Sequence, residues 1–213
     1  MIKKRIDEEY DLGVRRPNTD QIISLIYSAI EDPEERYSKE IMRQFAGSGI
    51  WAFDRIIKTK NGLYIIDDTQ RKDKIKFDES KIQKELKKQP DGVYRSGDER
   101  IRFVDTNSFK KNREVCETYP YRFIEIEIKR KNDIFLIALS SKEGAKKICE
   151  VAEELGLAPH TSFDHFNKMK DGNLEGIVRF WCNIEHGIDG NPMFDVEGIG
   201  RDGYGNGYGV LKY

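Results

Sequence analysis

The chain has 213 residues, of which 35% are charged, 38% hydrophobic and 11% aromatic, with a formal net charge of −1. This length allows one large domain or two small ones, and the aromatic content excludes a disordered chain. Nucleic-acid binders are often basic overall, so the balanced charge confines any nucleic-acid surface to a local patch. Three short basic runs could form such a patch, at 84–88, 109–113 and 128–132.

The N-terminal part predicts two helices. Residues 17–32 place apolar side chains at helical spacing after a proline and polar starters. A second helix is predicted over 32–47, where Asp32 can cap the first turn, Pro33 suits that turn and Gly47 ends the helix. Its apolar stripe would be formed by Tyr37, Ile41 and Phe45.

Two β-hairpins follow in the pattern. Residues 50–68 predict a hairpin with Asn61 and Gly62 at the centre of a type I′ turn, because both central residues of that turn need positive φ. Residues 92–104 predict a second hairpin around the turn 96–98. Between them, 74–77 could add a strand, and 80–88 predict a short helix that starts with a capping box.

Residues 121–141 predict a third hairpin. Ile124, Ile126 and Ile128 alternate with charged residues, as on a half-exposed strand. The return strand would be 134–139, which is apolar on both faces and would therefore lie centrally in the sheet. A helix should then begin at Ser140 or Ser141 and end at Gly156, with Ala145, Ile148, Cys149, Ala152 and Leu155 facing inward.

The C-terminal part is less regular. A shorter helix is predicted near 162–170, and 174–186 fit both a strand and a helix, with β-branched and aromatic content favouring the strand. The Gly-rich segment 190–213 should pack as a loop anchored by its aromatic residues, Phe194, Tyr204 and Tyr208. Together these elements predict a single α+β domain over 1–213, with two N-terminal helices packed on a largely antiparallel sheet built from hairpins and one or two further helices in the C-terminal half.

The cysteines and the hydropathy pattern bear on the compartment. Cys116, Cys149 and Cys182 are odd in number and form no C-x-x-C pair, which favours free thiols in a reducing environment. The first residues lack the apolar core of a signal peptide, and no run approaches eighteen apolar residues. We therefore expect a cytoplasmic protein without a membrane partner.

One short motif points to metal-dependent catalysis. Glu127, Ile128 and Lys129 form an E-x-K on a predicted strand, and this resembles half of the signature of the PD-(D/E)xK nuclease superfamily. The resemblance implies a second, upstream carboxylate and a Mg²⁺ ion that activates water beside the lysine. Asp98 and Asp105 are the candidates for that carboxylate. The alternative is that the motif belongs to the solvated face of an ordinary antiparallel strand.

Two weaker patterns suggest other chemistry. The segments 87–95 (KKQPDGVYR), 174–180 (LEGIVRF) and 210–213 (VLKY) resemble, in order, motifs of the adenylyltransferase domain of polynucleotide ligases. Lys88 departs from that pattern, because two residues instead of one separate it from Asp91. A zinc site would have to draw on the soft ligands of the C-terminal half, His160, His165, Cys182 and His186.

Two classes of function remain open from the sequence. The first is a non-catalytic protein that binds another macromolecule, protein or nucleic acid, through a hairpin face and the Gly/Tyr-rich tail. The second is the Mg²⁺-dependent nuclease centred on Glu127 and Lys129, with Asp105 or Asp98 as the second acid. The two differ in whether these acids converge in a concavity.

Overall fold

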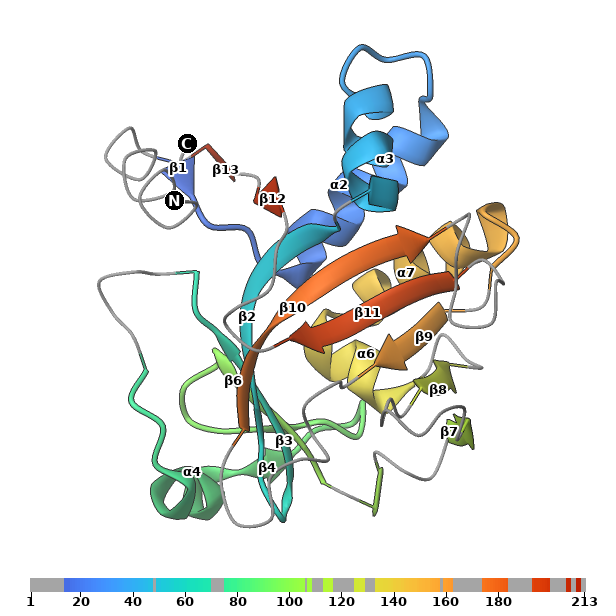
Figure 1. Ribbon diagram of the computed structural model, residues 1–213. Coiled ribbons are helices and arrows are strands. Elements are labelled where there is room, and N and C mark those ends of the chain that lie inside the picture. The colour runs from blue at the N-terminus through green and yellow to red at the C-terminus, as the bar shows by residue number, and fades with distance from the viewer. Residues whose placement is uncertain are drawn as a thin grey trace.

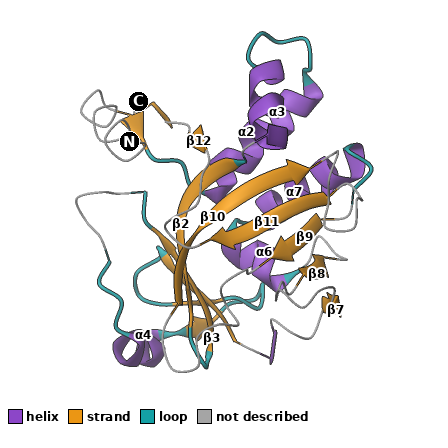
Figure 2. Ribbon diagram, viewed as in Figure 1, coloured by secondary structure: helices purple, strands orange, loops and turns teal. Residues whose placement is uncertain are grey.

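The computed structural model describes residues 14–47, 49–69, 75–105, 107–108, 113–116, 125–128, 133–157, 159–162, 174–183, 193–199, 206–207 and 210–211. It describes side chains in 16–47, 49–69, 75–105, 107–108 and 133–157, and the backbone in the other ranges. Figures 1 and 2 show the ribbon.

The helices are α2 (Thr19–Glu31), α3 (Ser38–Gly47), α4 (Glu79–Glu85), α6 (Ile134–Leu139) and α7 (Lys142–Glu154). The longer strands are β2 (Ile50–Lys58), β3 (Gly62–Asp67), β6 (Ile101–Asp105), β7 (Arg113–Cys116), β8 (Glu125–Ile128), β9 (Pro159–Ser162), β10 (Leu174–Asn183) and β11 (Met193–Ile199). The two-residue strands are β1 (Val14–Arg15), β4 (Lys87–Lys88), β5 (Tyr94–Arg95), β12 (Asn206–Gly207) and β13 (Val210–Leu211).

One large sheet organises the described part of the chain. Its strand order is β4-β5-β6-β3-β2-β10-β11-β9-β8-β7, and β12 pairs with β2. The pairs are antiparallel except β11 with β9 and β12 with β2. β1 pairs separately with β13, which brings the segments near the two ends of the chain together (Figure 1). The predicted α+β class and the largely antiparallel sheet are therefore confirmed.

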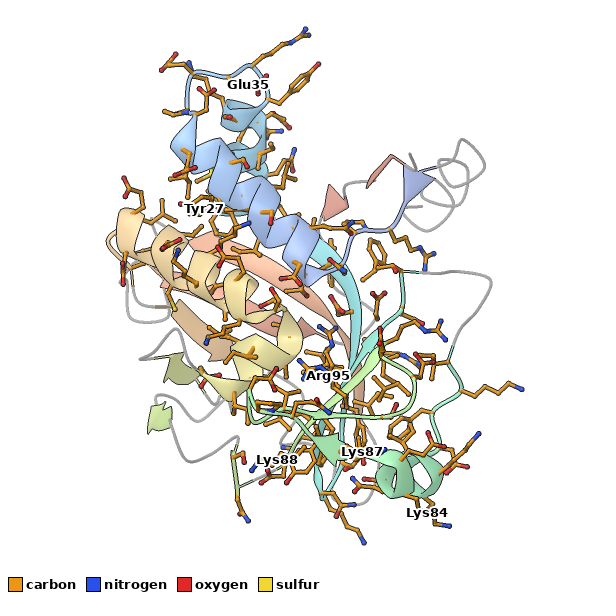
Figure 3. The ribbon with its side chains drawn as sticks, turned by 180° about the vertical axis from the view of Figure 1, so that it is seen from behind. Tyr27, Glu35, Lys84, Lys87, Lys88 and Arg95 are labelled. Atoms are coloured by element: carbon orange, nitrogen blue, oxygen red, sulfur yellow. The ribbon has the colours of Figure 1, made fainter. Side chains whose placement is uncertain are left out.

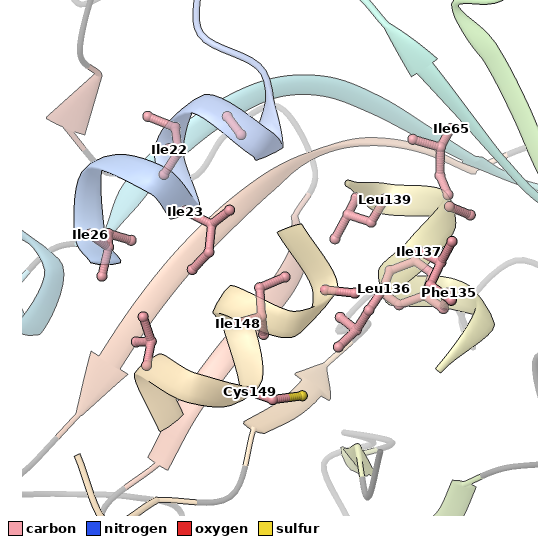
Figure 4. Packing of buried hydrophobic residues seen from close by; sticks show 14 of the residues in the cluster. Ile22, Ile23, Ile26, Ile65, Phe135, Leu136, Ile137, Leu139, Ile148 and Cys149 are labelled. Carbon is pink, nitrogen blue, oxygen red and sulfur yellow. The ribbon is translucent and has the colours of Figure 1, made fainter. Parts of the chain in front are cut away.

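The first face of the sheet carries the main core. Helices α2, α3, α6 and α7 pack there, and Figure 4 shows their side chains meeting between α2, α7 and α6. Ile22, Ile23 and Ile26 of α2 are almost fully buried, as is Ile148 of α7. Each such side chain contributes roughly 1.5–3 kcal/mol through removal of apolar surface from water.

A second core lies on the other face of the same strands. Along β3, Leu63 and Ile65 belong to the main core, whereas Tyr64 and Ile66 belong to the second, as the period of two along a strand requires. Ile82 of α4 is buried in the second core. Helix α4 is thus the described helix that covers this face, and it covers only part of it.

A buried ion pair connects strands β2 and β6 to the start of α2 and the end of α6. Asp54 on β2 is 0% exposed. It accepts a hydrogen bond from the backbone N–H of Thr19 at 2.6 Å and another from Arg102 Nη2 at 2.7 Å. Arg102 also donates to the carbonyls of Leu139 and Ser140 at the end of α6. Burial raises the pKa of Asp54, and the charge of Arg102 opposes this rise.

The third predicted hairpin is wrong in its second strand. Residues 134–139 form helix α6, because Asp133 caps it: the carboxylate accepts from the N–H groups of Phe135 and Leu136 at 2.9 and 3.1 Å. A short run that is apolar on every side suits a buried helix as well as a buried strand. The strand at Glu125–Ile128 is confirmed, but its partners are β7 and β9.

Several element ends also differ from the prediction. Helix α3 begins at Ser38, since Asp32 is the C-terminal cap of α2, and Tyr37 is 61% exposed. Helix α4 is capped by Asp78 instead of Ser80. Residues 75–77 lie outside any strand.

The first hairpin is confirmed, but its register centres the turn one residue earlier, on Lys60 and Asn61, because Thr59 pairs with Gly62. The hairpin over 92–104 is also confirmed, as is helix α7 with Ser141 as its cap and Cys149 buried. The strand at 174–183 is confirmed as well.

The predicted C-terminal loop is wrong for 193–199, which form strand β11 between β10 and β9. The predicted helix near 162–170 lies outside the described residues except for its first residue, which ends β9. Tyr204 and Tyr208 lie outside them too.

Candidate functional site

The second face of the sheet carries a row of aromatic side chains. The strand register places Tyr64 on β3 opposite Phe103 on β6, and Phe103 opposite Tyr94 on β5. The ring centroids of Tyr64 and Phe103 are 4.6 Å apart, and those of Phe103 and Tyr94 are 5.8 Å apart. We call these three residues the aromatic row. Lys88 on edge strand β4 continues it, with its Nζ 5.6 Å from the centroid of the Tyr94 ring.

Helix α4 is fastened across one end of the aromatic row by a polar network. Glu79 Oε1 accepts hydrogen bonds from Thr59 Oγ1 at 2.6 Å, Asn61 Nδ2 at 2.9 Å and the Tyr64 hydroxyl at 3.2 Å. Gln83 Nε2 donates to the same Tyr64 oxygen. Burial raises the pKa of Tyr64, and the charge of Glu79 raises it further, so the phenol stays neutral. The network holds α4 against the turn between β2 and β3.

A pocket of about 330 Å³ opens beside this network. Its lining combines two aromatic rings, one aliphatic side chain, two amides and one carboxylate, contributed by Tyr94, Phe103, Leu86, Asn61, Gln83 and Asp105. Its volume lies at the lower end of the range for small-ligand pockets. Gly62 lies opposite Asp105 in the register, and a Cβ there would come within 2.1 Å of the Val104 carbonyl oxygen. The close approach of β3 and β6 at the pocket therefore requires glycine.

Asp105 supplies the negative charge of the pocket. Its Oδ1 accepts from the backbone N–H of Ser108 at 2.9 Å, and its Oδ2 accepts from the Ser108 hydroxyl at 2.6 Å. Burial raises the pKa of Asp105, but the hydrogen bonds from Ser108 and from the backbone N–H of Asn107, together with the positive charge of Lys88, outweigh burial, and the pKa lies below its ordinary value. At neutral pH the group is therefore an ionised carboxylate, which can only accept hydrogen bonds.

Exposed lysines lie on α4 and β4, the elements on either side of the pocket residue Leu86. We call them the lysine rim, which consists of Lys81 and Lys84 on α4 and Lys87 and Lys88 on β4. Figure 3 labels three of the four at the end of the molecule that α4 and β4 form. The rim contains the basic run predicted at 84–88. The predicted runs 109–113 and 128–132 lie mostly outside the described residues.

A second concavity has the opposite charge. It lies between α2 and α7, has a volume of about 360 Å³ and is lined by Tyr27, Ile30, Val151 and four glutamates, Glu31, Glu150, Glu153 and Glu154. In Figure 3 the label of Tyr27 marks this groove, which lies well away from the labelled lysines of the rim. The four carboxylates therefore make this groove unfavourable for an anionic ligand.

The acids predicted as partners of Glu127 are not brought together with each other. Asp98 is engaged by Arg100, which donates to Oδ1 at 3.0 Å and to Oδ2 at 2.8 Å. Asp105 lies at the opposite end of β6, whose five residues at about 3.3 Å each separate the two carboxylates. Five strands stand between β6 and the strand of Glu127 in the sheet order. Lys129 lies outside the described residues.

The register gives Glu127 other neighbours. It pairs with Glu114 on β7 and with His160 on β9, and His160 pairs with Asp195 on β11. Directly paired positions lie side by side across a sheet, so these four positions form one row of the register. The sequence singled out Glu127 and His160 but not Glu114 or Asp195, because the pairing of strands so distant along the chain follows from the topology alone. Among the side chains that the structure describes, no three His, Cys, Asp or Glu form a group suited to a metal ion.

The remaining sequence motifs do not converge. Lys88 and Glu175, from the first two of the three ligase-like segments, stand five strands apart in the sheet order, and the third segment contains β13, which pairs with β1 outside the large sheet. Cys182 pairs with Phe194, one position along β11 from the partner of His160, and neighbouring positions on a strand face opposite sides of the sheet. His165 and His186 lie outside the described residues.

Comparison with protein-family models, with curated proteins and with solved structures finds no significant match to this chain. Within the described residues, no helix is long and apolar enough to cross a membrane.

Proposed function

We propose that this protein binds single-stranded nucleic acid without catalysis, at the pocket, the partly exposed ring of Tyr94 and the lysine rim. The observation that carries the proposal is a pocket that combines aromatic rings with amide side chains, with exposed lysines on the neighbouring elements α4 and β4. Lysines bind phosphates, aromatic rings stack on bases, and amides bond to base edges. Such a surface also fits a chain with a net charge of only −1, because the basic charge is local.

The half-buried ring of Tyr94 favours single strands over duplexes. A base can stack on a side-chain ring only when its own face is free, which a duplex does not allow. Stacking on one aromatic side chain contributes about 1–3 kcal/mol per base. The lysines then add the salt-dependent attraction that results from counterion release.

Lysines on an edge strand have another role in proteins, since they discourage pairing with the edge of a second sheet. That role explains Lys87 and Lys88 on β4 but not Lys81 and Lys84, which lie three residues apart on one face of α4. It also does not explain the pocket. An acidic protein is the rival partner for the rim, and it would have no use for a ring beside two amides.

The test is a pair of charge-matched variants. Fluorescence anisotropy with a labelled single-stranded oligonucleotide should show binding to the wild-type protein. Lys84→Glu/Lys88→Glu should weaken this binding by about tenfold or more, since two phosphate contacts become repulsive. Lys39→Glu/Lys142→Glu changes the charge equally at exposed positions on α3 and α7 and should leave the affinity within about twofold. Equal losses in both variants, or no binding at all, would contradict the proposal.

A second candidate function is the Mg²⁺-dependent nuclease predicted from the E-x-K motif. It is supported by the row of Glu114, Glu127, His160 and Asp195, because carboxylates and imidazoles are metal ligands. The row would supply the second acid in place of Asp98 or Asp105. If this function is correct, the purified protein cuts DNA or RNA with Mg²⁺, and Glu127→Ala and Lys129→Ala each abolish cutting, whereas Asp98→Ala does not.

A further inference from the structure

The pocket beside the aromatic row has one acceptor-only wall. Leu86, Tyr94 and Phe103 form apolar walls, which suit a flat heteroaromatic ring. Asp105 lies in β6 two residues beyond Phe103, so the two face the same side of the sheet. A ring that packs against Phe103 and Tyr94 therefore presents its edge to an ionised carboxylate.

The hydrogen bonds of Asp105 leave it able to bind a ligand with two donors. Ser108 donates one hydrogen bond to each carboxylate oxygen. An ionised carboxylate has about four acceptor positions, two on each oxygen. Ser108 and the backbone N–H of Asn107 use part of this capacity, and a ligand with two parallel N–H donors can bind the carboxylate from the pocket, which Asp105 lines.

Guanine is the base that offers this pattern. Its N1–H and N2–H₂ groups lie side by side on the Watson–Crick edge, whereas adenine and cytosine set a ring acceptor beside the amino group. Uracil sets two carbonyl oxygens beside its N3–H, and a carboxylate repels them. A site built around a charged acceptor rejects ligands that lack the matching donors.

An arginine side chain also presents two parallel N–H donors to a carboxylate. The positive charge around the pocket favours a nucleotide over such a side chain. Lys88 lies close enough to Asp105 to lower its pKa and also stands over the Tyr94 ring. It repels a guanidinium and attracts a phosphate. The rest of the lysine rim acts in the same direction.

From these contacts we infer that the pocket selects a guanine base, inserted between Tyr94 and Leu86 with its Watson–Crick edge on Asp105. This inference rests on the proposed function and names the base that the site accepts from a single strand. Asn61 and Gln83 stand on the same lining, and the second N–H of each amide can donate to the O6 and N7 acceptors on the adjoining Hoogsteen edge of guanine.

The test compares the four ribonucleoside monophosphates by isothermal titration calorimetry. GMP should bind about tenfold or more tightly than AMP, CMP or UMP, since a good bidentate pair discriminates by about that factor. Asp105→Asn replaces one acceptor by a donor and should reduce the preference to less than about threefold. Asp98→Asn is the matched control, because it changes an aspartate with a lowered pKa at the other end of β6 and should keep the preference.

A second variant guards against misfolding of Asp105→Asn. Leu86→Trp fills the pocket from the residue that follows α4 and should remove GMP binding while the lysine rim still binds oligonucleotides. Oligonucleotide binding without any base preference overturns the guanine site but leaves the proposed function standing. If the wild-type protein binds no oligonucleotide at all, both the guanine site and the proposed function are overturned. Tighter binding of N-acetyl-arginine amide than of GMP overturns the nucleotide in favour of a cationic peptide.

Discussion

Asp54 and Arg102 form a buried ion pair that holds α2, β2, β6 and α6 against one another. Arg102→Leu leaves the carboxylate of Asp54 fully buried without its charged partner, and we expect a loss of about 3–5 kcal/mol in the free energy of unfolding. The double variant Asp54→Leu/Arg102→Leu should lose less than the sum of the single variants, as measured by urea denaturation. Additive losses would show that the pair is not coupled.

Asp98 gives the protein a defined response to acid. Hydrogen bonds from Arg100 hold the pKa of Asp98 below its ordinary value. A carboxyl whose pKa is lower in the folded state stabilises the fold above its unfolded pKa of about 3.9, and this contribution is lost as the pH falls through the folded pKa. Asp98→Asn should therefore lower Tm at neutral pH and have almost no effect on Tm at the acid end of that window. An equal effect at both pH values would contradict the pairing.

At the scale of single elements, capping residues determine the type and the ends of a helix where the hydrophobic pattern alone fits more than one structure. The amphipathic helices α2 and α7 and the first two hairpins were predictable, because their periods and turn residues agree. Helix α6 was not, since six consecutive apolar residues satisfy two structures and Asp133 decides between them from outside the run. In α3, Asp32 and Pro33 pointed to a start that the chain uses instead to end α2.

Helix α6 provides the test at this scale. Asp133 is buried and accepts hydrogen bonds from two backbone N–H groups. Asp78, the N-terminal cap of α4, is exposed and accepts a hydrogen bond from one. Asp133→Ala should destabilise the protein by about 2 kcal/mol, at the upper end of the range for caps. Asp78→Ala should cost about 0.5 kcal/mol. Chemical denaturation of both variants measures the difference, and the reverse order would contradict the assignment of α6 as a capped, buried helix.

The candidate site was predictable only in its parts. The lysines at 84–88 and the carboxylate of Asp105 were identified from the sequence, the latter for a different chemistry. The pocket itself was not, because it depends on Gly62 pairing with Asp105 and on α4 crossing the aromatic row. These are facts of strand register and helix placement, and no local pattern carries them.

At the scale of the whole molecule, the sheet depends on strands from both ends of the sequence. Strand β11 pairs with β10 on one side and with β9 on the other, so it is interior to the sheet. Truncation after Gly190 removes it and exposes the edges of two strands. We expect the truncated protein to lose its cooperative thermal transition, as followed by circular dichroism. A truncated protein that melts like the full chain would show that β11 is dispensable.

The central claim is that the lysine rim and the pocket bind single-stranded nucleic acid, and the salt dependence of affinity tests it most directly. The logarithm of the association constant should fall linearly with the logarithm of the salt concentration, with a slope of about −0.7 per phosphate contact. Lys84→Glu/Lys88→Glu should make that slope shallower by about 1.4 if both lysines contact phosphates. An affinity that does not change with salt, or a slope that is the same in the wild-type protein and the variant, would contradict the account.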